Sequence, residues 1–216
     1  MKKNVTFLLD PANLWMEDVL KNYNFKQKNR YNFKITKNSK SVKNQDIVFP
    51  ICYTKILPNN FLNINKLVLI VHPSKLPQNK GFAATQHEIL KNKNKIFVTM
   101  IKAEKKPDNG PICLQDYFNL NGTELISEIR RKQSTTYLRI IKFFLNKYPK
   151  VSFRKQKGKE NFIKRRTPKD SELNINKSIK DQFNHLRIND NDLYPSFFYY
   201  KKTKYLLKIF KDIKKK

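Results

Sequence analysis

The residue best suited to carry chemistry in this chain of 216 residues is His72, which ends the strand-like run Lys66 to His72 and precedes a loop. An imidazole titrates near neutral pH and can therefore accept or donate a proton. In open α/β sheets, ligands bind outside the carboxyl ends of the strands, which is where His72 is expected. A single histidine at a strand end is more often structural, so its neighbours decide the interpretation.

Two segments close to His72 restrict the backbone. Pro73, Pro77 and Gly81 follow it, and Pro107-Asp108-Asn109-Gly110 comes after the next predicted strand. The second segment is a strong turn signal by itself. Because the chain contains only four glycines, a glycine in such a segment indicates a positive φ or a close backbone approach.

Several other chemistries are not indicated. The chain has neither G-x-G-x-x-G nor G-x-x-x-x-G-K-[ST], two common phosphate-binding patterns. Three histidines (72, 87 and 185) and two distant cysteines do not form a recognisable metal-ligand set, so we expect no metal. Cys52 and Cys113 fall in strand-like runs, where buried, inert thiols are the common case.

The elements that must position these residues follow from hydrophobic patterning. The predicted strands are Val5–Leu9, Tyr31–Ile35, Asp46–Tyr53, Lys66–His72, Lys95–Ala103 and Ile112–Leu120. The predicted helices are Ala12–Tyr23 (with Asp10-Pro11 as its start and Leu14, Val19 and Leu20 buried), Ala83–Leu90, a long helix opened by Asn121-Gly122-Thr123-Glu124, and Asn176–Ile188. Strands alternating with helices predict a doubly wound α/β domain over residues 1–150.

Residues 151–216 are predicted to be a linker followed by a C-terminal extension. Residues 151–170 are charged and extended, and Phe197 to Phe210 has the pattern of a hairpin that turns at Lys201-Lys202-Thr203-Lys204. A hairpin alone is marginal in water, so it must pack on the first domain or on another subunit. We expect a homodimer.

The formal net charge of +29 suggests a polyanionic partner, because basic surfaces bind phosphate backbones. The chain is also rich in Asn, Ile, Phe and Tyr, whose codons, like those of Lys, are AT-rich. The only compact basic block is the tail from Lys211 to Lys216, and no nucleic-acid-binding motif accompanies it. We therefore expect no specific nucleic-acid partner.

Nothing in the sequence predicts a membrane or export signal. The longest apolar run, Leu67 to Val71, is far shorter than a spanning helix, and the apolar stretch after Met1 ends at Asp10. The two distant cysteines are not those of a disulfide scaffold. A cytoplasmic protein is the expectation.

The segments around His72 resemble those of a known family, the 10-formyltetrahydrofolate-dependent formyltransferases. His72-Pro73-Ser74-Lys75-Leu76-Pro77 with Gly81, followed by Asp108-Asn109-Gly110, is similar to the family's H-x-S-x-L-P-x-x-x-G and D-x-G patterns. Further similar segments are Tyr53-Thr54-Lys55-Ile56-Leu57-Pro58 (Y-G-x-I-L-P, with Thr54 in place of Gly), Gln86-His87-Glu88-Ile89 (Gln-Trp-x-Ile) and Asn121-Gly122-Thr123-Glu124-Leu125 (G-x-x-L).

This resemblance implies a Rossmann-like domain with a mixed, mostly parallel sheet, and transfer of a formyl group from N10-formyltetrahydrofolate to an amine. His72 would move the proton and Asp108 would orient or stabilise the ring. The implied folate contacts are Tyr53, Ile56, Leu57, Ser74, Leu76, Pro77 and Gly110. The implied substrate contacts are Lys80, Gly81, Gln86, Arg166 and Tyr194. Turn chemistry for Ser74, a solvated charge for Lys80 and packing for Tyr194 remain alternative interpretations.

The last third of the chain resembles one branch of the family. Arg165-Arg166-Thr167-Pro168-Lys169-Asp170, Leu186-Arg187-Ile188 and Tyr194-Pro195-Ser196-Phe197 are similar to the R-x-T-P-x-D, I-R and Y-P-x-A-F segments of enzymes that act on nucleotide-linked amino sugars. The implied substrate is a dTDP-linked aminodideoxy sugar for O-antigen or other surface polysaccharide. One alternative is a methionyl-tRNA formyltransferase-like enzyme, although residues after Lys150 are too few for that enzyme's C-terminal barrel. The other is a non-catalytic folate or nucleotide binder.

One position departs from the family pattern. The family has Asn two residues before the histidine, on the same strand face, where its amide helps to hold the developing oxyanion. That position is Ile70 here, and Val68 on the same face is apolar as well. Either another group such as Gln86 or a backbone N–H replaces the amide, or turnover is slow or lost.

Overall fold

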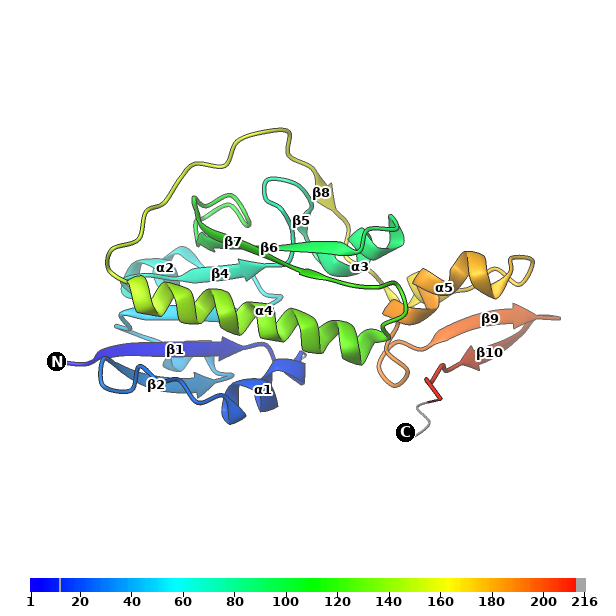
Figure 1. Ribbon diagram of the computed structural model, residues 1–216, viewed down its shortest axis with the longest axis horizontal. Coiled ribbons are helices and arrows are strands. Elements are labelled where there is room, and N and C mark those ends of the chain that lie inside the picture. Colours follow the sequence, from blue (N-terminus) through cyan, green and yellow to red (C-terminus); the bar gives the residue numbers. More distant parts are fainter. Residues whose placement is uncertain (12, 213–216) are drawn as a thin grey trace.

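The structure of the protein, a computed structural model, describes residues 1–11 and 13–212. At its centre lies a mixed sheet of two three-stranded parts, in the orders β2-β1-β3 and β4-β6-β7, which meet where Val48 pairs in parallel with Val68 (Figure 1). The strands are β1 (Lys3–Leu9), β2 (Tyr31–Thr36), β3 (Ile47–Ile51), β4 (Leu69–His72), β6 (Lys95–Lys102) and β7 (Ile112–Asn119). β1 is parallel to β2 and β3, whereas β6 is antiparallel to β4 and β7. The prediction of a mixed, mostly parallel α/β sheet is confirmed.

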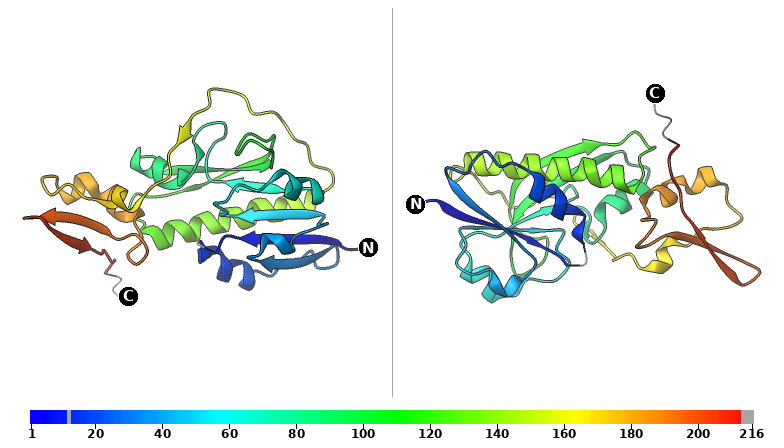
Figure 2. Two further views of the ribbon diagram at one scale, coloured as in Figure 1. Left: turned by 180° about the vertical axis from the view of Figure 1, so that it is seen from behind. Right: turned by 90° about the horizontal axis from the view of Figure 1, so that it is seen from below.

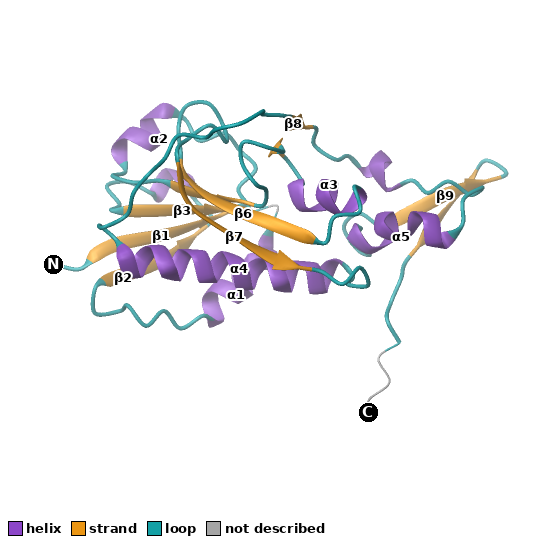
Figure 3. Cartoon of the chain, turned by 45° about the horizontal axis from the view of Figure 1, so that its top comes forward, coloured by secondary structure: helices purple, strands orange, loops and turns teal. Residues whose placement is uncertain are grey.

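Helices cover both faces of this sheet, because successive side chains of a strand point to opposite sides. On one face Phe7 and Phe49 belong to the large core that includes Phe144 of α4 (Ile126–Lys147), and the Phe49 and Phe144 ring centroids are 6.1 Å apart. On the other face Leu8 packs in a second cluster with Phe61 of α2 (Asn59–Ile64). Figure 3 shows α4 running along the sheet and α2 beyond the strands. The sheet is therefore buried on two sides, which explains its continuous apolar runs.

The first helix begins later than the sequence predicts. A 3-10 turn (Leu14–Met16) precedes α1 (Glu17–Asn22), and Leu14 is 43% exposed, while Ala12 lies outside the described residues. Asp10 accepts hydrogen bonds from the backbone N–H and the hydroxyl of Thr54, at 2.7 and 2.5 Å. The loop after β3 is thereby tied to the carboxyl end of β1. The helix α2 is six residues long and was not predicted.

The remaining predicted elements are present with small shifts. They are α3 (Ala84–Leu90), α5 (Ile179–Ile188), β9 (Ser196–Tyr200) and β10 (Thr203–Leu207). The 3-10 turns at Ser39–Ser41 and Pro168–Ser171 were not predicted. β9 and β10 form the predicted hairpin, whose turn residues Lys201 and Lys202 both have positive φ, as a two-residue hairpin turn requires. The hairpin extends away from the sheet (Figures 1 and 2), and the lysines after Asp212 lie outside the described residues.

The predicted linker does more than connect two regions. After α4 the chain passes along the whole sheet, over the top in Figure 1, and then forms the short strand β8 (Phe162–Ile163). β8 pairs in parallel with β5 (Lys80–Gly81), which lies only eight residues after His72. The linker therefore re-enters the first domain beside the predicted site.

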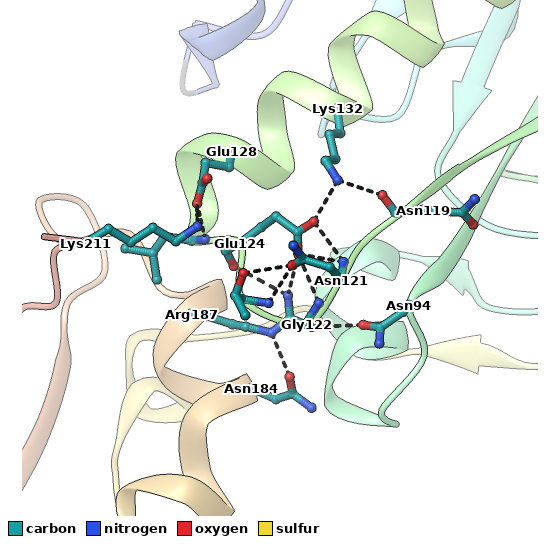
Figure 4. Close-up of polar contacts among 12 residues, drawn as sticks. Asn94, Asn119, Asn121, Gly122, Glu124, Glu128, Lys132, Asn184, Arg187 and Lys211 are labelled. Carbon is teal, nitrogen blue, oxygen red and sulfur yellow. Dashed lines mark hydrogen bonds and ion pairs between the residues drawn. The ribbon is translucent and has the colours of Figure 1, made fainter. Parts of the chain in front are cut away.

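A buried ion pair attaches the C-terminal extension to α4 (Figure 4). The guanidinium of Arg187, 1% exposed, lies 3.7 Å from the carboxylate of Glu124, which also accepts hydrogen bonds from Lys132 and from the Asn121 backbone. Burial raises the pKa of Glu124, but the bonds from Lys132 and Asn121 outweigh it and lower that pKa to about 2. Lys211, near the end of the described chain, pairs with Glu128 at 2.6 Å. None of the described helices is long and apolar enough to cross a membrane.

Candidate active site

His72 and Asp108 come together at the carboxyl end of β4. The ring nitrogen Nδ1 of His72 lies 3.5 Å from Oδ1 of Asp108, and both side chains are largely buried. The other ring nitrogen, Nε2, is 2.9 Å from the carbonyl oxygen of Asn79, which can only accept, so Nε2 carries a proton. In the neutral ring the free lone pair is then on Nδ1 and faces the carboxylate. The pair can therefore take up a proton on the side shared by Nδ1 and Asp108.

Two glycines fix the position of Asp108. Oδ2 of Asp108 accepts a 2.9 Å hydrogen bond from the backbone N–H of Gly81, which has a φ of +105°. A Cβ at Gly81 would lie 2.6 Å from the carbonyl oxygen of Ile163, and a Cβ at Gly110 would lie 1.6 Å from that of Lys102. Neither position can hold a side chain without moving the backbone, which explains why glycines occur at both motif positions.

A cavity of about 490 Å³ lies against the His72–Asp108 pair. Besides the pair, the predicted site residues that line it are Tyr53, Ile56, Leu57, Gly81, Gln86, Arg166 and Tyr194. The cavity thus joins the loop after β3, the carboxyl end of β4, the start of α3 and the C-terminal extension. Its position at the carboxyl ends of the strands is the one expected for a ligand site in an open α/β sheet.

Five other predicted site residues are not among the described residues that line this cavity: Ser74, Leu76, Pro77, Lys80 and Gly110. The hydroxyl of Ser74 donates to the Gln78 carbonyl at 2.7 Å, and Leu76 packs in a small core with Ile101. Pro77 follows a cis peptide bond in the same loop. Ser74, Leu76 and Pro77 shape the loop between β4 and α3, and Gly110 lies in the turn between β6 and β7.

Lys80 is not positioned to contact a phosphate group in the cavity. Its side chain is 3% exposed, and Nζ donates to Asn109 at 2.6 Å and pairs with Glu160 at 2.5 Å. The ammonium also lies 5.6 Å from the centre of the Phe162 ring. Lys80 therefore neither lies on the cavity wall nor is solvated, because Glu160 and Phe162 of the linker cover it.

The R-x-T-P segment of the extension reaches the cavity through Arg165, Arg166 and Thr167. One guanidinium nitrogen of Arg166 donates to the Asp170 carbonyl at 2.7 Å and to Asn189 at 2.9 Å. Burial lowers the pKa of Arg166, with the charge of Asp170 acting against it, yet an arginine remains cationic at neutral pH. These contacts fix a positive charge at the cavity wall.

Sequence reasoning missed the contribution of α4 to the cavity. Arg130, Gln133 and Tyr137 line it from this helix, where their spacing is simply that of a buried face. Thr85 donates to Gln133 at 2.9 Å, and Gln133 in turn donates to the Tyr137 hydroxyl at 2.9 Å. Burial raises the pKa of Tyr137 well above its ordinary value, so its hydroxyl keeps its proton as a donor.

Ile70 also lines the cavity and packs against the small cores on that side of the sheet. The position two residues before His72 is therefore an apolar part of the wall. Gln86, the predicted substitute donor, is half-buried on the same cavity. The structure brings both residues to the site.

The cysteines do not offer a reactive thiolate. Cys52 lines the cavity, and burial raises its pKa to about 12. Burial likewise raises the pKa of Cys113 to about 11. Across residues 1–11 and 13–212, no group of three or more His, Cys, Asp or Glu side chains is arranged to hold a metal ion.

Comparison with known proteins is consistent with this site. The family model for formyl transferases matches residues 9–140, which include the His72 and Asp108 segments. Methionyl-tRNA formyltransferase of Sulfurihydrogenibium sp. (strain YO3AOP1) is 28% identical over 148 residues, 67% of this chain and 48% of its own length. That of Caldicellulosiruptor saccharolyticus is 32% identical over 92 residues, 42% of this chain and 30% of its own length. The matches thus span about half or less of these curated relatives.

Solved structures share the fold at low sequence identity. Methionyl-tRNA formyltransferase from Clostridium thermocellum has a TM-score of 0.78 at 20% identity and covers 94% of this chain and 90% of its own. A sugar N-formyltransferase from Shewanella sp FDAARGOS_354 has a TM-score of 0.70 at 16% identity and covers 99% of each chain. HypX from Aquifex aeolicus in complex with tetrahydrofolic acid has a TM-score of 0.71 at 13% identity, over all of this chain and 40% of its own. With the family model matching well over half of the sequence, the chain belongs to the formyl transferase family.

Proposed function

We propose that the protein transfers a formyl group from N10-formyltetrahydrofolate to the amine of a nucleotide-linked aminodideoxy sugar. The observation that carries this proposal is that one cavity joins the His72–Asp108 pair to Arg166 and Tyr194 of the C-terminal extension. The R-x-T-P and Y-P segments resemble those of sugar-modifying family members, and a sugar N-formyltransferase shares the fold. We further propose the cytoplasm as its location and a dTDP-linked sugar for O-antigen or other surface polysaccharide as its substrate.

The cavity has the properties that the two ligands need. The loop after β3 offers Tyr53, Ile56 and Leu57, an aromatic and apolar wall against which the ring system of a folate can pack. The cavity wall also carries Arg165 and Arg166, and guanidinium groups suit the oxygens of a diphosphate. A volume of about 490 Å³ is within the usual range of small-molecule sites. When bound, the folate supplies the formyl group.

The side chains account for the proton that moves from the amine to the departing folate. As the amine bonds to the formyl carbon it gives up one proton, which Nδ1 of His72 accepts while Nε2 is held by the Asn79 carbonyl. Asp108 faces the cationic ring and stabilises it. When the bond between the formyl carbon and N10 breaks, the ring returns this proton to N10 of the tetrahydrofolate. Asp108 itself is kept in place by the Gly81 backbone N–H. Because Ile70 lacks an amide, we propose Gln86 as the donor to the oxygen on which negative charge develops.

A second candidate function is formylation of methionyl-tRNA. The curated relatives carry that name, and the net charge of +29 would favour an RNA substrate. A panel assay distinguishes the two. The protein is incubated with N10-formyltetrahydrofolate and either amino-sugar nucleotides or initiator methionyl-tRNA, and the products are read by mass for one added formyl group.

We expect a formylated sugar nucleotide with the wild type and none above background with His72→Ala. The surface variant Lys159→Ala serves as the matched control and should retain wild-type turnover. Formylated methionyl-tRNA without any formylated sugar would replace the proposal by the second candidate. Folate binding without turnover on any acceptor would favour a non-catalytic binder.

A further inference from the structure

The linker segment 154–163 reaches both residues of the His72–Asp108 pair. It contacts Asp108 directly through Gln156, and it reaches His72 through Asn79, which Asn161 contacts. At one end of the segment the backbone of Arg154 forms an antiparallel β-bridge with Ile112 of β7, and at the other end β8 pairs with β5. Gln156 and Asn161 lie between these two backbone pairings. We propose that this segment is a strap whose residues Gln156 and Asn161 position the His72–Asp108 pair for proton transfer.

Asn161 acts on His72 through Asn79. Oδ1 of Asn161 accepts from the backbone N–H of Asn79 at 3.0 Å, and its Nδ2 donates to the Asn79 side chain at 2.9 Å. The Asn161 carbonyl also accepts from the backbone N–H of Lys80 at 3.0 Å. Two of these bonds hold the backbone N–H groups on either side of the Asn79 carbonyl, and the third holds the Asn79 side chain. The Asn79 carbonyl accepts the hydrogen bond from Nε2 of His72. Asn79 has a φ of +54°, a conformation that needs such support.

The Asn79 side chain is held from the other direction as well. Its Nδ2 donates to Glu88 of α3, and Asn79 is 5% exposed. Asn79 can therefore neither rotate its carbonyl away from His72 nor exchange Asn161 for water without losing several bonds. Through this arrangement Asn161 determines that Nε2 is the protonated nitrogen and that Nδ1 remains available to the pair.

Gln156 holds Asp108 from the opposite side. Its Nε2 donates to the carbonyl oxygens of Asp108 and Gly110, at 2.7 and 2.8 Å. Its Oε1 is buried and has no hydrogen-bond partner among the described residues. Because that oxygen gains no bond in this orientation, the orientation of the amide is set by its two donations. Asp108, with a φ of +55°, is thereby held between Gln156 and the Gly81 N–H.

The proposal rests on the proposed function only for its kinetic readout, because a spectroscopic readout needs no substrate. The chain contains three histidines, so the ring nitrogens of His72 can be assigned in ¹H–¹⁵N correlation spectra by comparison with His72→Gln. The wild type should show His72 in the neutral form protonated on Nε2. In Asn161→Ala we expect a mixture of the two neutral forms, since the carbonyl partner of Nε2 is no longer fixed.

The kinetic readout uses the same variants. Asn161→Ala should lower kcat by between about 10-fold and 100-fold, leave KM for both substrates within about twofold, and move the midpoint of the pH–rate profile. Gln156→Glu has the same shape but cannot donate to the two carbonyls, and it should lower kcat at least as much as Gln156→Ala. The exposed neighbour Lys159→Ala is the control and should match the wild type in spectrum and rate.

The outcomes separate this proposal from the proposed function. His72 protonated on Nδ1 in the wild type, or an unchanged spectrum in folded Asn161→Ala, would overturn the positioning role whatever the substrate is. A Gln156→Glu variant with wild-type kcat would overturn the role of Gln156. If no amino sugar is formylated but the spectra change as expected, the strap proposal stands and the substrate assignment fails.

Discussion

The guanidinium of Arg187 lies 3.7 Å from the carboxylate of Glu124 in the interior of the protein, and this contact joins two segments 63 residues apart. Glu124 belongs to the segment that precedes α4, and Arg187 to the helix α5 of the extension (Figure 4). Arg187 also donates to Asn184 at 2.7 Å, so its position on α5 is fixed. Two sequence segments that resemble separate family motifs thus form one structural joint.

The bonds that Glu124 accepts from Lys132 and from the Asn121 backbone predict a loss of stability in acid. The folded-state pKa of Glu124 is about 2 and its ordinary value is 4.5, so the folded state favours the charged carboxylate. The stabilisation is fully present above about pH 4.5 and is lost as the pH falls toward 2, for a total of roughly 3 kcal/mol. In Glu124→Gln, urea unfolding should show a shallower pH dependence over this window than in the wild type. Asp192→Asn, at a residue whose side chain is 85% exposed, is the control, and an equal change in both variants would contradict this assignment.

Removing the buried cation of Arg187 should lower the stability of the protein more than removing an exposed charge. Arg187→Met leaves the Glu124 carboxylate buried beside Lys132 alone, and breaking a buried pair typically costs about 3–5 kcal/mol. Lys208→Met removes an exposed pair with Asp192, which is worth at most about 1 kcal/mol. Thermal and urea unfolding of the two variants measure the difference. Equal stabilities would show that the extension is not attached through Arg187.

The fold could largely be predicted from the sequence, because its strands are buried on both sides and read as continuous apolar runs. The strand ending at His72 was placed to its last residue, and the long helix predicted after Asn121-Gly122-Thr123-Glu124 is α4, whose Ile129, Leu138, Ile141 and Leu145 are buried. Short elements could not be predicted in this way. The strands β5 and β8 have two residues each, which is too few for any periodicity.

The site was predictable only where a motif marks it. His72, Asp108 and Gly81 stand in register with a recognisable pattern, and the structure brings them together. Gln156 and Asn161 lie in a charged stretch without periodicity, and nothing in such a stretch shows which backbone groups it will meet. Lys80 was misread for a related reason: a lysine in a lysine-rich chain looks exposed, whereas Glu160 and Phe162 bury this one.

The close packing at Gly110 predicts a strong effect of a single methyl group. Gly110→Ala places a Cβ 1.6 Å from the Lys102 carbonyl, so the turn that carries Asp108 must move. Gly158→Ala is the matched control, because its Cβ meets no atom within 4 Å and the variant bears only the strain of a φ of +108°. We expect Gly110→Ala to be the less stable of the two by several kcal/mol and to lose formyl transfer. Similar melting temperatures of the two variants would mean that the turn at Gly110 can move at little cost in stability.

The hairpin supports the prediction of a homodimer. The hairpin projects from the domain (Figure 2), with Tyr199 and Leu206 47 and 60% exposed on one face and Tyr205 46% exposed on the other. Such a group of apolar side chains is typical of an interface. Light scattering at micromolar concentration should give twice the mass of the chain, and Leu206→Asp should give the monomer mass. Lys202→Asp, at the hairpin turn, controls for the added charge, and a monomeric wild type would refute the prediction.

The apolar wall at Ile70 leads to the last prediction, which concerns turnover. If Gln86 stabilises the developing oxyanion, Gln86→Ala should lower kcat by about 10²–10³-fold, the usual effect of losing one such donor, with little change in KM. Ile70→Asn places an amide two residues before His72 on the same strand face and should restore part of that loss in the double variant. Ile70→Val, which keeps the wall apolar, is the control and should not restore it. Single-turnover rates with each variant measure these effects. A Gln86→Ala protein with wild-type kcat would show that the donor is another group, and His72→Ala with wild-type kcat would show that the chemistry lies elsewhere.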